Sequence, residues 1–355
     1  MALIVGDSLP PLKLPSGSNP AFVVDSVGGR YLVFGLLSGA DDDAVKAGIA
    51  LIEANRNRFN DAHACVFGIV PDRPEWRRRC QDQLPGLRWL FDQNGEVARS
   101  LSGDSDPAWL LLDPTLRVLG RTRAETAPEL IASVSSLPPP DLHTGTEAFA
   151  PVLLVPRIFE PDFCTALIET YRSRGGEPSG FMREVDGVTR LIKDPRHKLR
   201  SDTHLPEGDL KEQARARILR RLIPQIQKAF QYRATRMERY LVACYDSETG
   251  GHFRPHRDNT TKGTAHRRFA VSINLNQDFD GGNLRFPEYG SRTYRPPLGG
   301  AVVFSCSLLH EATAVTRGQR YAFLPFLYDE EAANIREANL RYIDPALLEA
   351  SPTPA

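Results

Sequence analysis

The stretch from Val242 to Asn259, VACYDSETGGHFRPHRDN, carries the clearest structural and chemical pattern in the chain. An apolar, strand-forming run leads into a turn rich in Gly, Ser and Asp, and a second extended run then brings His256 and Asp258. Because these two residues are two positions apart, an extended backbone places both side chains on one face, where they can converge on one ion. Alone, a His-x-Asp pair is a weak signal.

The pair gains weight from His310, which follows the strand-like run AVVFS and precedes Arg320 by ten residues. Two imidazoles and one carboxylate bind a metal on one side and leave positions open, an arrangement suited to non-haem Fe(II) oxygenase chemistry. A zinc hydrolase needs only one open position and usually a nearby general base, for which this region offers no clear candidate. The spacing therefore favours an oxygenase centre.

Apolar periodicity around these residues predicts helices that lead into a run of short strands. The segment 149–171 indicates a strand, a turn and a helix, and a longer helix is expected over 208–230, bent or ended near Pro224. The expected strands cover 237–245, 269–275, 282–286, 301–304 and 320–327. This order predicts a double-sheet β barrel with helices packed outside it.

Three segments, 242–259, 271–290 and 298–323, resemble the prolyl 4-hydroxylase-like branch of the Fe(II)/2-oxoglutarate dioxygenases. The resemblance covers about residues 150–330, with its specific part at 240–328. It implies a double-stranded β-helix (jelly-roll) barrel with supporting helices. It also implies site roles: His256, Asp258 and His310 as the iron ligands and catalytic centre, and Arg320, Tyr245 and Asn274 as residues that bind the cosubstrate. Asn274 departs from the pattern, since some relatives carry a second tyrosine there.

The same resemblance implies Fe(II) as the metal, 2-oxoglutarate and O2 as cosubstrates, and ascorbate as a candidate reductant. The reaction it implies is hydroxylation of a C–H bond of a prolyl residue in a protein or peptide, with release of succinate and CO2. Retention of Asp258 favours hydroxylation over halogenation, because halogenating relatives carry a small residue there. Two alternatives stay open: hydroxylation of a small molecule or free amino acid, and a non-catalytic sensor or binding protein for O2 or 2-oxoglutarate.

Neighbouring residues are expected to play lesser parts. Arg317 is a rival to Arg320 but is expected in a turn, and His252 is expected in a loop or facing the substrate. His266 is expected to be exposed to solvent. The pair Gly281-Gly282 indicates a tight connection between strands, because no helix follows that would make it a phosphate loop.

The proline-rich stretch Ser135-Ser-Leu-Pro-Pro-Pro-Asp141 marks a domain boundary, giving domains over 1–138 and 139–355. The first shows strand-like runs at 31–37, 64–70 and 108–112 and helical spacing at 42–59, which predicts an α/β sandwich. Segments 6–14, 91–101 and 109–120 resemble the peroxiredoxin and thioredoxin-like families. The segment in which those families carry their peroxidatic cysteine, residues 38–44, reads SGADDDA here and contains no cysteine. We therefore expect a scaffold, a docking module or a surface for homo-oligomers.

The five cysteines are far apart and include no CxxC pair, which argues against a disulfide framework or a Cys-based zinc site. Buried, reduced thiols are the expected state. Cys80, which follows Arg77-Arg-Arg79, is the one thiol with a basic neighbourhood and hence the one redox candidate.

The 355 residues carry 44 basic and 44 acidic side chains, so overall charge gives no reason to expect nucleic acid or membrane binding. The apolar runs are too short to span a membrane, and the first residues lack the basic region of a signal peptide. We therefore expect a cytoplasmic protein. Residues 187–268, however, contain 19 basic and 9 acidic side chains. This local basic excess indicates either a solvated basic face or a surface that attracts an acidic polypeptide. Nucleic acid is a less favoured partner, because no aromatic side chains for base stacking accompany the charges.

Overall fold

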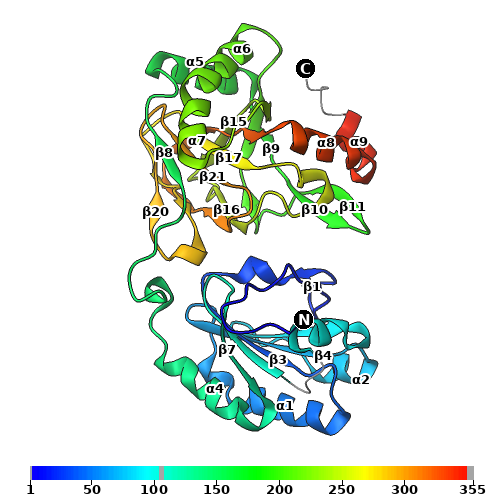
Figure 1. The fold of residues 1–355 in the computed structure, drawn as a ribbon. Helices are drawn as coiled ribbons and strands as arrows, with labels where there is room; N and C mark the ends of the chain where they lie inside the picture. Colours follow the sequence, from blue (N-terminus) through cyan, green and yellow to red (C-terminus); the bar gives the residue numbers. More distant parts are fainter. Residues whose placement is uncertain (1, 104–107, 350–355) are drawn as a thin grey trace. The chain divides into compact units, whose positions relative to one another are not determined.

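A computed structural model describes residues 2–103 and 108–349, which form two compact units (Figure 1). The first unit comprises Met1–Ala150 together with Phe286–Arg292, and the second comprises Pro151–Arg285 and Thr293–Ala355. The segment 286–292 therefore belongs to the first unit although the chain around it belongs to the second. The prolines of the predicted boundary lie within the first unit: Pro138 and Pro139 connect a short helical turn over Val134–Ser136 to a second one over Pro140–Leu142, which Pro140 begins.

The first unit is built on a mixed sheet of five strands in the order β5-β4-β3-β6-β7. Three parallel strands are followed by two antiparallel ones: β3 (Tyr31–Leu36), β4 (Ala64–Pro71), β5 (Leu87–Asp92), β6 (Ala108–Leu112) and β7 (Val118–Arg123). The three expected strands are confirmed. Every residue of β3, β4 and β6 is buried, as expected for apolar strands covered on both faces.

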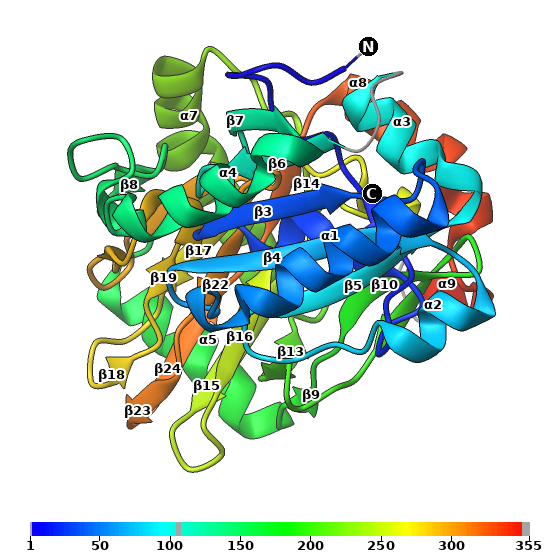
Figure 2. The ribbon, with the colours of Figure 1, turned by 90° about the horizontal axis from the view of Figure 1, so that it is seen from below.

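Helices cover both faces of this sheet. The helices α1 (Asp42–Ala54), α2 (Pro74–Arg79) and α4 (Ala127–Ser133) contribute to the core on one face, and Figure 2 shows α1 lying across the strands. The helix α3 (Glu96–Ser102) and the hairpin of β1 (Lys13–Leu14) and β2 (Phe22–Val23) contribute to the core on the other. The expected helix over 42–59 ends earlier, at Ala54, and continues as a 3₁₀ turn over Arg56–Arg58.

The second unit contains two larger antiparallel sheets. The nine-stranded sheet has the order β14-β25-β17-β24-β15-β13-β9, with β21 and β8 attached through β17. Its strands are β8 (Leu153–Val155), β9 (Glu177–Pro178), β13 (Ser201–His204), β14 (Arg236–Glu238), β15 (Leu241–Asp246), β17 (Phe269–Asn274), β21 (Ala301–Ser305), β24 (Gln319–Phe323) and β25 (Phe326–Tyr328).

The five-stranded sheet has the order β12-β16-β22-β19-β20. Its strands are β12 (Lys198–Leu199), β16 (His252–His256), β19 (Leu284–Arg285), β20 (Thr293–Tyr294) and β22 (His310–Ala312). Two two-stranded sheets stand apart from both larger sheets: the hairpin of β10 (Phe181–Val185) and β11 (Val188–Ile192), and the pair of β18 (Asp280–Gly281) and β23 (Val315–Arg317), which are distant in the chain.

Helices pack on one face of the nine-stranded sheet, and alternation along the strands places a mixture of apolar and polar side chains on the other face. The helices α5 (Pro161–Arg174), α6 (Asp209–Arg217) and α7 (Ile223–Phe230) share a core with Val242, Cys244, Ile273 and Phe323. Neighbours of opposite parity, such as Tyr245, Asn274 and Arg320, therefore point away from that core. At the chain's end lie α8 (Glu330–Ala338) and α9 (Pro345–Glu349).

Two expected strands prove to be interrupted. The segment 237–245 is divided between β14 and β15 by Arg239, whose φ of 67° lies in the left-handed region. The segment 320–327 is divided at Leu324-Pro325, where proline has no amide hydrogen for the ladder. The helix over 208–230 is bent as expected: a π-helical turn at Ile218–Leu222 separates α6 from α7 just before Pro224.

In the part of the chain that the structure describes, no helix has the length and apolar character needed to cross a membrane.

Candidate metal centre

His256, Asp258 and His310 are brought together by two neighbouring strands. His256 is the last residue of β16, His310 is the first of β22, and the two are direct partners in the antiparallel ladder. The register shifts between Phe253 and His256, an irregularity of the kind that redirects side chains next to functional sites. Asp258 lies in the turn that follows β16. Its backbone N–H donates a hydrogen bond to the Cys306 carbonyl at 2.9 Å, which fixes the position of the turn.

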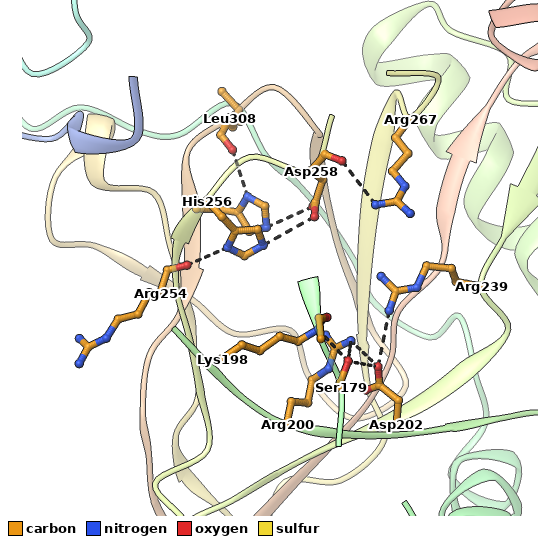
Figure 3. Close-up of polar contacts among 12 residues, drawn as sticks. Ser179, Lys198, Arg200, Asp202, Arg239, Arg254, His256, Asp258, Arg267 and Leu308 are labelled. Carbon is orange, nitrogen blue, oxygen red and sulfur yellow. Dashed lines mark hydrogen bonds and ion pairs between the residues drawn. The ribbon is translucent and has the colours of Figure 1, made fainter. Parts of the chain in front are cut away.

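The ligand atoms of these three side chains converge on one point. One atom from each residue lies within 4.8 Å of the other two. Asp258 faces both rings: its Oδ1 is 3.6 Å from His256 Nε2 and its Oδ2 is 3.3 Å from His310 Nε2 (Figure 3). The arrangement therefore presents two nitrogens and one carboxylate from the same side.

Backbone carbonyls fix which nitrogen each imidazole presents. His256 Nδ1 donates to the Arg254 carbonyl at 2.8 Å, and His310 Nδ1 donates to the Leu308 carbonyl at 3.0 Å. Because each Nδ1 must carry the proton to donate, the lone pair of a neutral ring lies on Nε2, the atom facing Asp258. Both imidazoles are thus oriented as metal ligands.

Aromatic side chains hold the two ring planes. Phe253 stacks on His256 with ring centroids 3.5 Å apart and an interplanar angle of 20°. Phe304 packs its edge against His310 at 4.5 Å. Such packing restricts rotation of both imidazoles and keeps water from their apolar faces.

The protonation states also fit a cation. Burial, together with the neighbouring His310, lowers the pKa of His256 to about 4. Burial alone would raise the pKa of Asp258, but His310 and His256 hold it well below its usual value. A neutral imidazole and an ionised carboxylate are the forms that bind metals, so His256 and Asp258 are in the required state at neutral pH.

The centre opens into a cavity between side chains of the two sheets. The five-stranded sheet contributes Phe253, His256, Leu284, His310 and Ala312, and the nine-stranded sheet contributes Tyr245, Ala270, Val271, Ser272, Arg320 and Phe326. The site thus combines an apolar wall with a few convergent polar groups, as small-molecule sites commonly do.

Arg320 is the buried cation of the nine-stranded sheet. It is 2% exposed, and burial lowers the pKa of its guanidinium to about 10. Its Nε donates to Asn274 Oδ1 at 3.1 Å and its Nη2 to Ser272 Oγ at 2.6 Å. Tyr245 is its direct partner across β15 and β24, with the guanidinium carbon 5.4 Å from the ring centroid. Both side chains line the cavity.

Asn274 lies behind Arg320 and is not among the residues that line the cavity. It is 1% exposed, and its amide nitrogen donates to the Pro296 carbonyl at 3.0 Å while its oxygen accepts from Arg320. In this structure Asn274 orients the arginine.

The remaining sequence candidates lie outside the centre. Arg317 is exposed at the end of β23 and pairs with Asp280, and His252 lies within β16, where its Nδ1 donates to the Gly250 carbonyl. The expectation that His266 is solvent-exposed is wrong: it is 2% exposed and contacts buried Glu238 at 3.0 Å. The glycines 281 and 282 both have positive φ, as a tight connection requires.

All five cysteines are buried and unpaired. Burial raises the pKa of Cys80 to about 12 despite the neighbouring Arg79. A thiol with so high a pKa carries almost no thiolate at neutral pH, which removes the basis for the redox activity considered above.

Sequence reasoning did not identify Arg200, Asp202 and Arg239 as site residues. Arg200 and Arg239 line the cavity, and Asp202 joins them (Figure 3). A signal was available, since Lys198, Arg200 and Asp202 alternate at a spacing of two, which would put three charged residues on one face of a strand. Arg239 had no comparable signal.

Comparison with known proteins supports this assignment of the centre. Residues 240–328 match the 2OG-Fe(II) oxygenase superfamily. All three candidate ligands and Arg320 lie inside the matched region. The match implies Fe(II), 2-oxoglutarate and O2, and the His-Asp-His set fits iron, because it leaves adjacent coordination positions open.

Individual relatives are distant. The chain is 28% identical over 156 residues to a PKHD-type hydroxylase of Synechococcus sp. (strain JA-2-3B'a(2-13)), a match that covers 39% of this chain and 64% of the relative. It is also 28% identical to the multifunctional procollagen lysine hydroxylase and glycosyltransferase of Caenorhabditis elegans, over 46% of this chain and 22% of that protein. Among solved structures, a Pseudomonas putida prolyl-4-hydroxylase aligns with 54% of this chain and 96% of its own, at 20% identity and a TM-score of 0.40.

Proposed function

We propose that the protein is an Fe(II)- and 2-oxoglutarate-dependent hydroxylase that acts on a prolyl residue of a protein or peptide. The convergence of His256, Asp258 and His310 beside a buried arginine in one cavity carries the proposal. Bound Fe(II), 2-oxoglutarate and O2 would replace a C–H bond by C–OH, with conversion of 2-oxoglutarate to succinate and CO2.

In this proposal His256 Nε2, one oxygen of Asp258 and His310 Nε2 hold the metal. The backbone carbonyls of Arg254 and Leu308 keep both rings in the ligating tautomer. No movement of the chain between strands is needed to assemble the centre, because the β16–β22 ladder already pairs the two histidines. The residues outside the ligand set therefore act by orienting it.

Arg320 would bind the carboxylate of 2-oxoglutarate that is remote from the metal. Nε and Nη2 are used by Asn274 and Ser272, and these bonds fix the plane of the guanidinium. A charge-assisted hydrogen bond in a cavity shielded from water is stronger than one at the surface. Tyr245 would add a hydroxyl from the opposite strand, and Asn274 would act through Arg320.

The prolyl substrate rests on the sequence resemblance, and the names of the curated relatives agree with a hydroxylase. Hydroxylation of a free amino acid or another small molecule is the second candidate, supported by a cavity lining that combines an apolar wall with a few convergent polar groups. The basic residues of 187–268 are compatible with an acidic polypeptide partner. A pure sensor is disfavoured because all three ligands and Arg320 are retained.

For the second unit we propose a jelly-roll core, and for the first a thioredoxin-like scaffold without a redox thiol. Two facing antiparallel sheets with ligands on the smaller one support the former. Three parallel strands followed by an antiparallel pair, with helices on both faces, support the latter. Ser38, near the position of the peroxidatic cysteine in the resembled families, donates to Asp92 at 2.6 Å.

The test of the reaction is succinate release by the iron-loaded protein, measured with and without a library of proline-containing peptides. Peptide-stimulated succinate release with a gain of 16 Da on proline is the expected result. Efficient turnover of a free amino acid and none of any peptide would replace the prolyl-protein substrate by the second candidate. Binding of 2-oxoglutarate without succinate release, with or without a substrate, would favour the sensor.

A further inference from the structure

Three guanidiniums line the cavity, yet the reaction proposed above uses only Arg320. The other two, Arg200 and Arg239, come from the chain before β13 and from the break between β14 and β15. They meet at one carboxylate, Asp202, whose Oδ2 accepts from Arg200 Nη2 at 2.6 Å and lies 3.5 Å from Arg239 Nη2 (Figure 3). The cluster needs an explanation of its own.

Arg239 is the member with most of its hydrogen-bonding capacity unused. Among the described residues it has a single ionic contact, to Asp202, and none accepts a hydrogen bond from it at normal geometry. A guanidinium has five N–H donors, and the Arg239 side chain, which is 26% exposed and lines the cavity, keeps most of them open to a ligand. Its left-handed φ of 67° costs a non-glycine residue about 1 kcal/mol, so the fold maintains an unfavourable backbone conformation where this side chain enters the cavity.

Arg200 and Asp202 form the buried base of the cluster. The Arg200 side chain is 4% exposed and that of Asp202 is 9% exposed. Arg200 donates through Nη1 to the Tyr245 hydroxyl at 3.3 Å, but its Nε has no partner. Asp202 Oδ2 also accepts from Ser179 Oγ at 2.5 Å, while Oδ1 has none. The local network is thus incomplete at both ends.

Charge points to the missing ligand. The three cavity arginines face two carboxylates, Asp202 and the metal ligand Asp258. Fe(II) and the dianion of 2-oxoglutarate cancel each other, so one positive charge remains when both are bound. A carboxylate would neutralise this charge, and it matches the planar fork of a guanidinium with two parallel hydrogen bonds.

We propose that Arg239 and Arg200 form a substrate subsite that binds one carboxylate of the molecule to be hydroxylated. This inference rests on the proposed function and names its substrate class: a monoanion with the carboxylate close to the reacting carbon. The carboxylate is either a terminal α-carboxylate or the side chain of an acidic neighbour in a peptide. Asp202 is a positioning residue that holds the two arginines side by side.

The experiment compares acids with their neutral amides on the anaerobic Fe(II)- and 2-oxoglutarate-loaded protein. N-acetylproline against N-acetylprolinamide tests a terminal carboxylate, and acetyl-Pro-Asp-amide against acetyl-Pro-Asn-amide tests an acidic neighbour. In at least one pair we expect the acid to bind about tenfold more tightly or better, as for a hydrogen bond to a charged group. The pair that shows the preference identifies the source of the carboxylate.

Variants assign the preference to the cluster. Arg239→Gln is expected to bring the acid-to-amide ratio close to one, with 2-oxoglutarate affinity unchanged, and Arg239→Lys to keep part of the preference. Arg196→Gln removes the same charge from a side chain that is 91% exposed and is expected to change neither value. Thermal unfolding of each variant separates loss of the fold from loss of the subsite.

Two results would overturn the inference: equal binding of acid and amide in both wild-type pairs, or an Arg239→Gln variant whose main loss is affinity for 2-oxoglutarate. The second would assign the cluster to the cosubstrate. Failure of the proposed function looks different, because the wild-type protein would then not bind 2-oxoglutarate at all.

Discussion

At the scale of single residues, contacts rather than residue type separate the arginines of this site. Arg320 is held by Ser272 and Asn274. Arg267 is instead paired with buried Glu238 at 2.6 Å, and its Nη1 lies 3.4 Å from the Asp258 carbonyl. Arg320 therefore keeps an N–H donor for a ligand, whereas Arg267 connects the turn that carries Asp258 to the carboxylate of Glu238. We expect substitutions at the two positions to affect different properties.

Arg320→Gln is expected to weaken 2-oxoglutarate binding about 100-fold, because a charge-assisted bond worth about 1.5–3 kcal/mol is lost. Asn274→Ala should weaken it less, about tenfold, since it removes only a bond that orients the arginine. Titration of 2-oxoglutarate into each Mn(II)-loaded variant measures both effects. An Asn274→Ala loss as large as that of Arg320→Gln would mean that Asn274 binds the cosubstrate itself.

Glu238→Gln is expected to lower the free energy of unfolding by about 3 kcal/mol at pH 7, because Arg267 loses its buried partner. Burial alone would raise the pKa of Glu238, but the charge of Arg267 and the bond from His266 hold it well below its usual value. The stabilisation is therefore complete above about pH 5.5, where glutamate is ionised in the unfolded chain too, and is lost progressively as the pH falls below that. Urea unfolding at pH 7 and pH 3 checks this, since the difference between wild type and variant must shrink in acid.

At this scale the sequence predicts the groups whose spacing follows from strand geometry. His256 and Asp258 are close in the chain, and His310 and Arg320 flank a readable strand. Arg200 and Asp202 could have been identified from their alternation. The burial of His266 could not be predicted, because its partner Glu238 lies 28 residues earlier in the chain, on β14.

At the scale of secondary structure elements, the break between β14 and β15 links backbone conformation to the site. A continuous strand over 237–245 would keep Arg239 in the alternating pattern of its neighbours. The left-handed residue instead ends one strand and begins another. The backbone preferences of the residues do not predict this break, because arginine does not favour positive φ. An irregularity of the helix near Pro224, in contrast, was predictable from the proline, although its form, a π-helical turn over Ile218–Leu222, was not.

Arg239→Gly is expected to be more stable than Arg239→Ala by about 1 kcal/mol, since both remove the side chain but only glycine adopts the left-handed conformation without strain. The same pair of substitutions at Arg236, within β14, should show the opposite order. Chemical denaturation of the four variants measures the two differences. Equal stability of the Gly and Ala variants at position 239 would argue against backbone strain.

At the scale of the whole molecule, the basic excess of residues 187–268 is reduced by acids from elsewhere in the chain. Arg217 and Arg221 pair with Glu160, Arg236 with Glu330, and Arg190 lies 3.9 Å from Asp344. A count along the sequence cannot include these pairs because they form only on folding. The basic segment is therefore a weaker attractant for acidic partners than its composition indicates.

The cysteines give a prediction that spans both units. All five are buried, and burial raises the pKa of Cys65, Cys80 and Cys164 to about 12 and that of Cys244 to about 11. Because the thiolate is the reactive form, we expect no rapid reaction with a disulfide reagent at pH 8 in the native protein and five reactive thiols in guanidinium chloride. A fast-reacting thiol in the native state would reopen a redox role for the first unit.

The most direct test of the account is anaerobic titration of 2-oxoglutarate into the Fe(II)-loaded protein, followed by the visible charge-transfer band of the iron–2-oxoglutarate complex. We predict a saturable band in the wild-type protein and none in His310→Ala, which removes one of the three converging ligands, while Arg317→Gln, an exposed control outside the centre, retains it. Absence of the band in correctly folded, iron-loaded wild-type protein, or its persistence in His310→Ala, would contradict the assignment of this site.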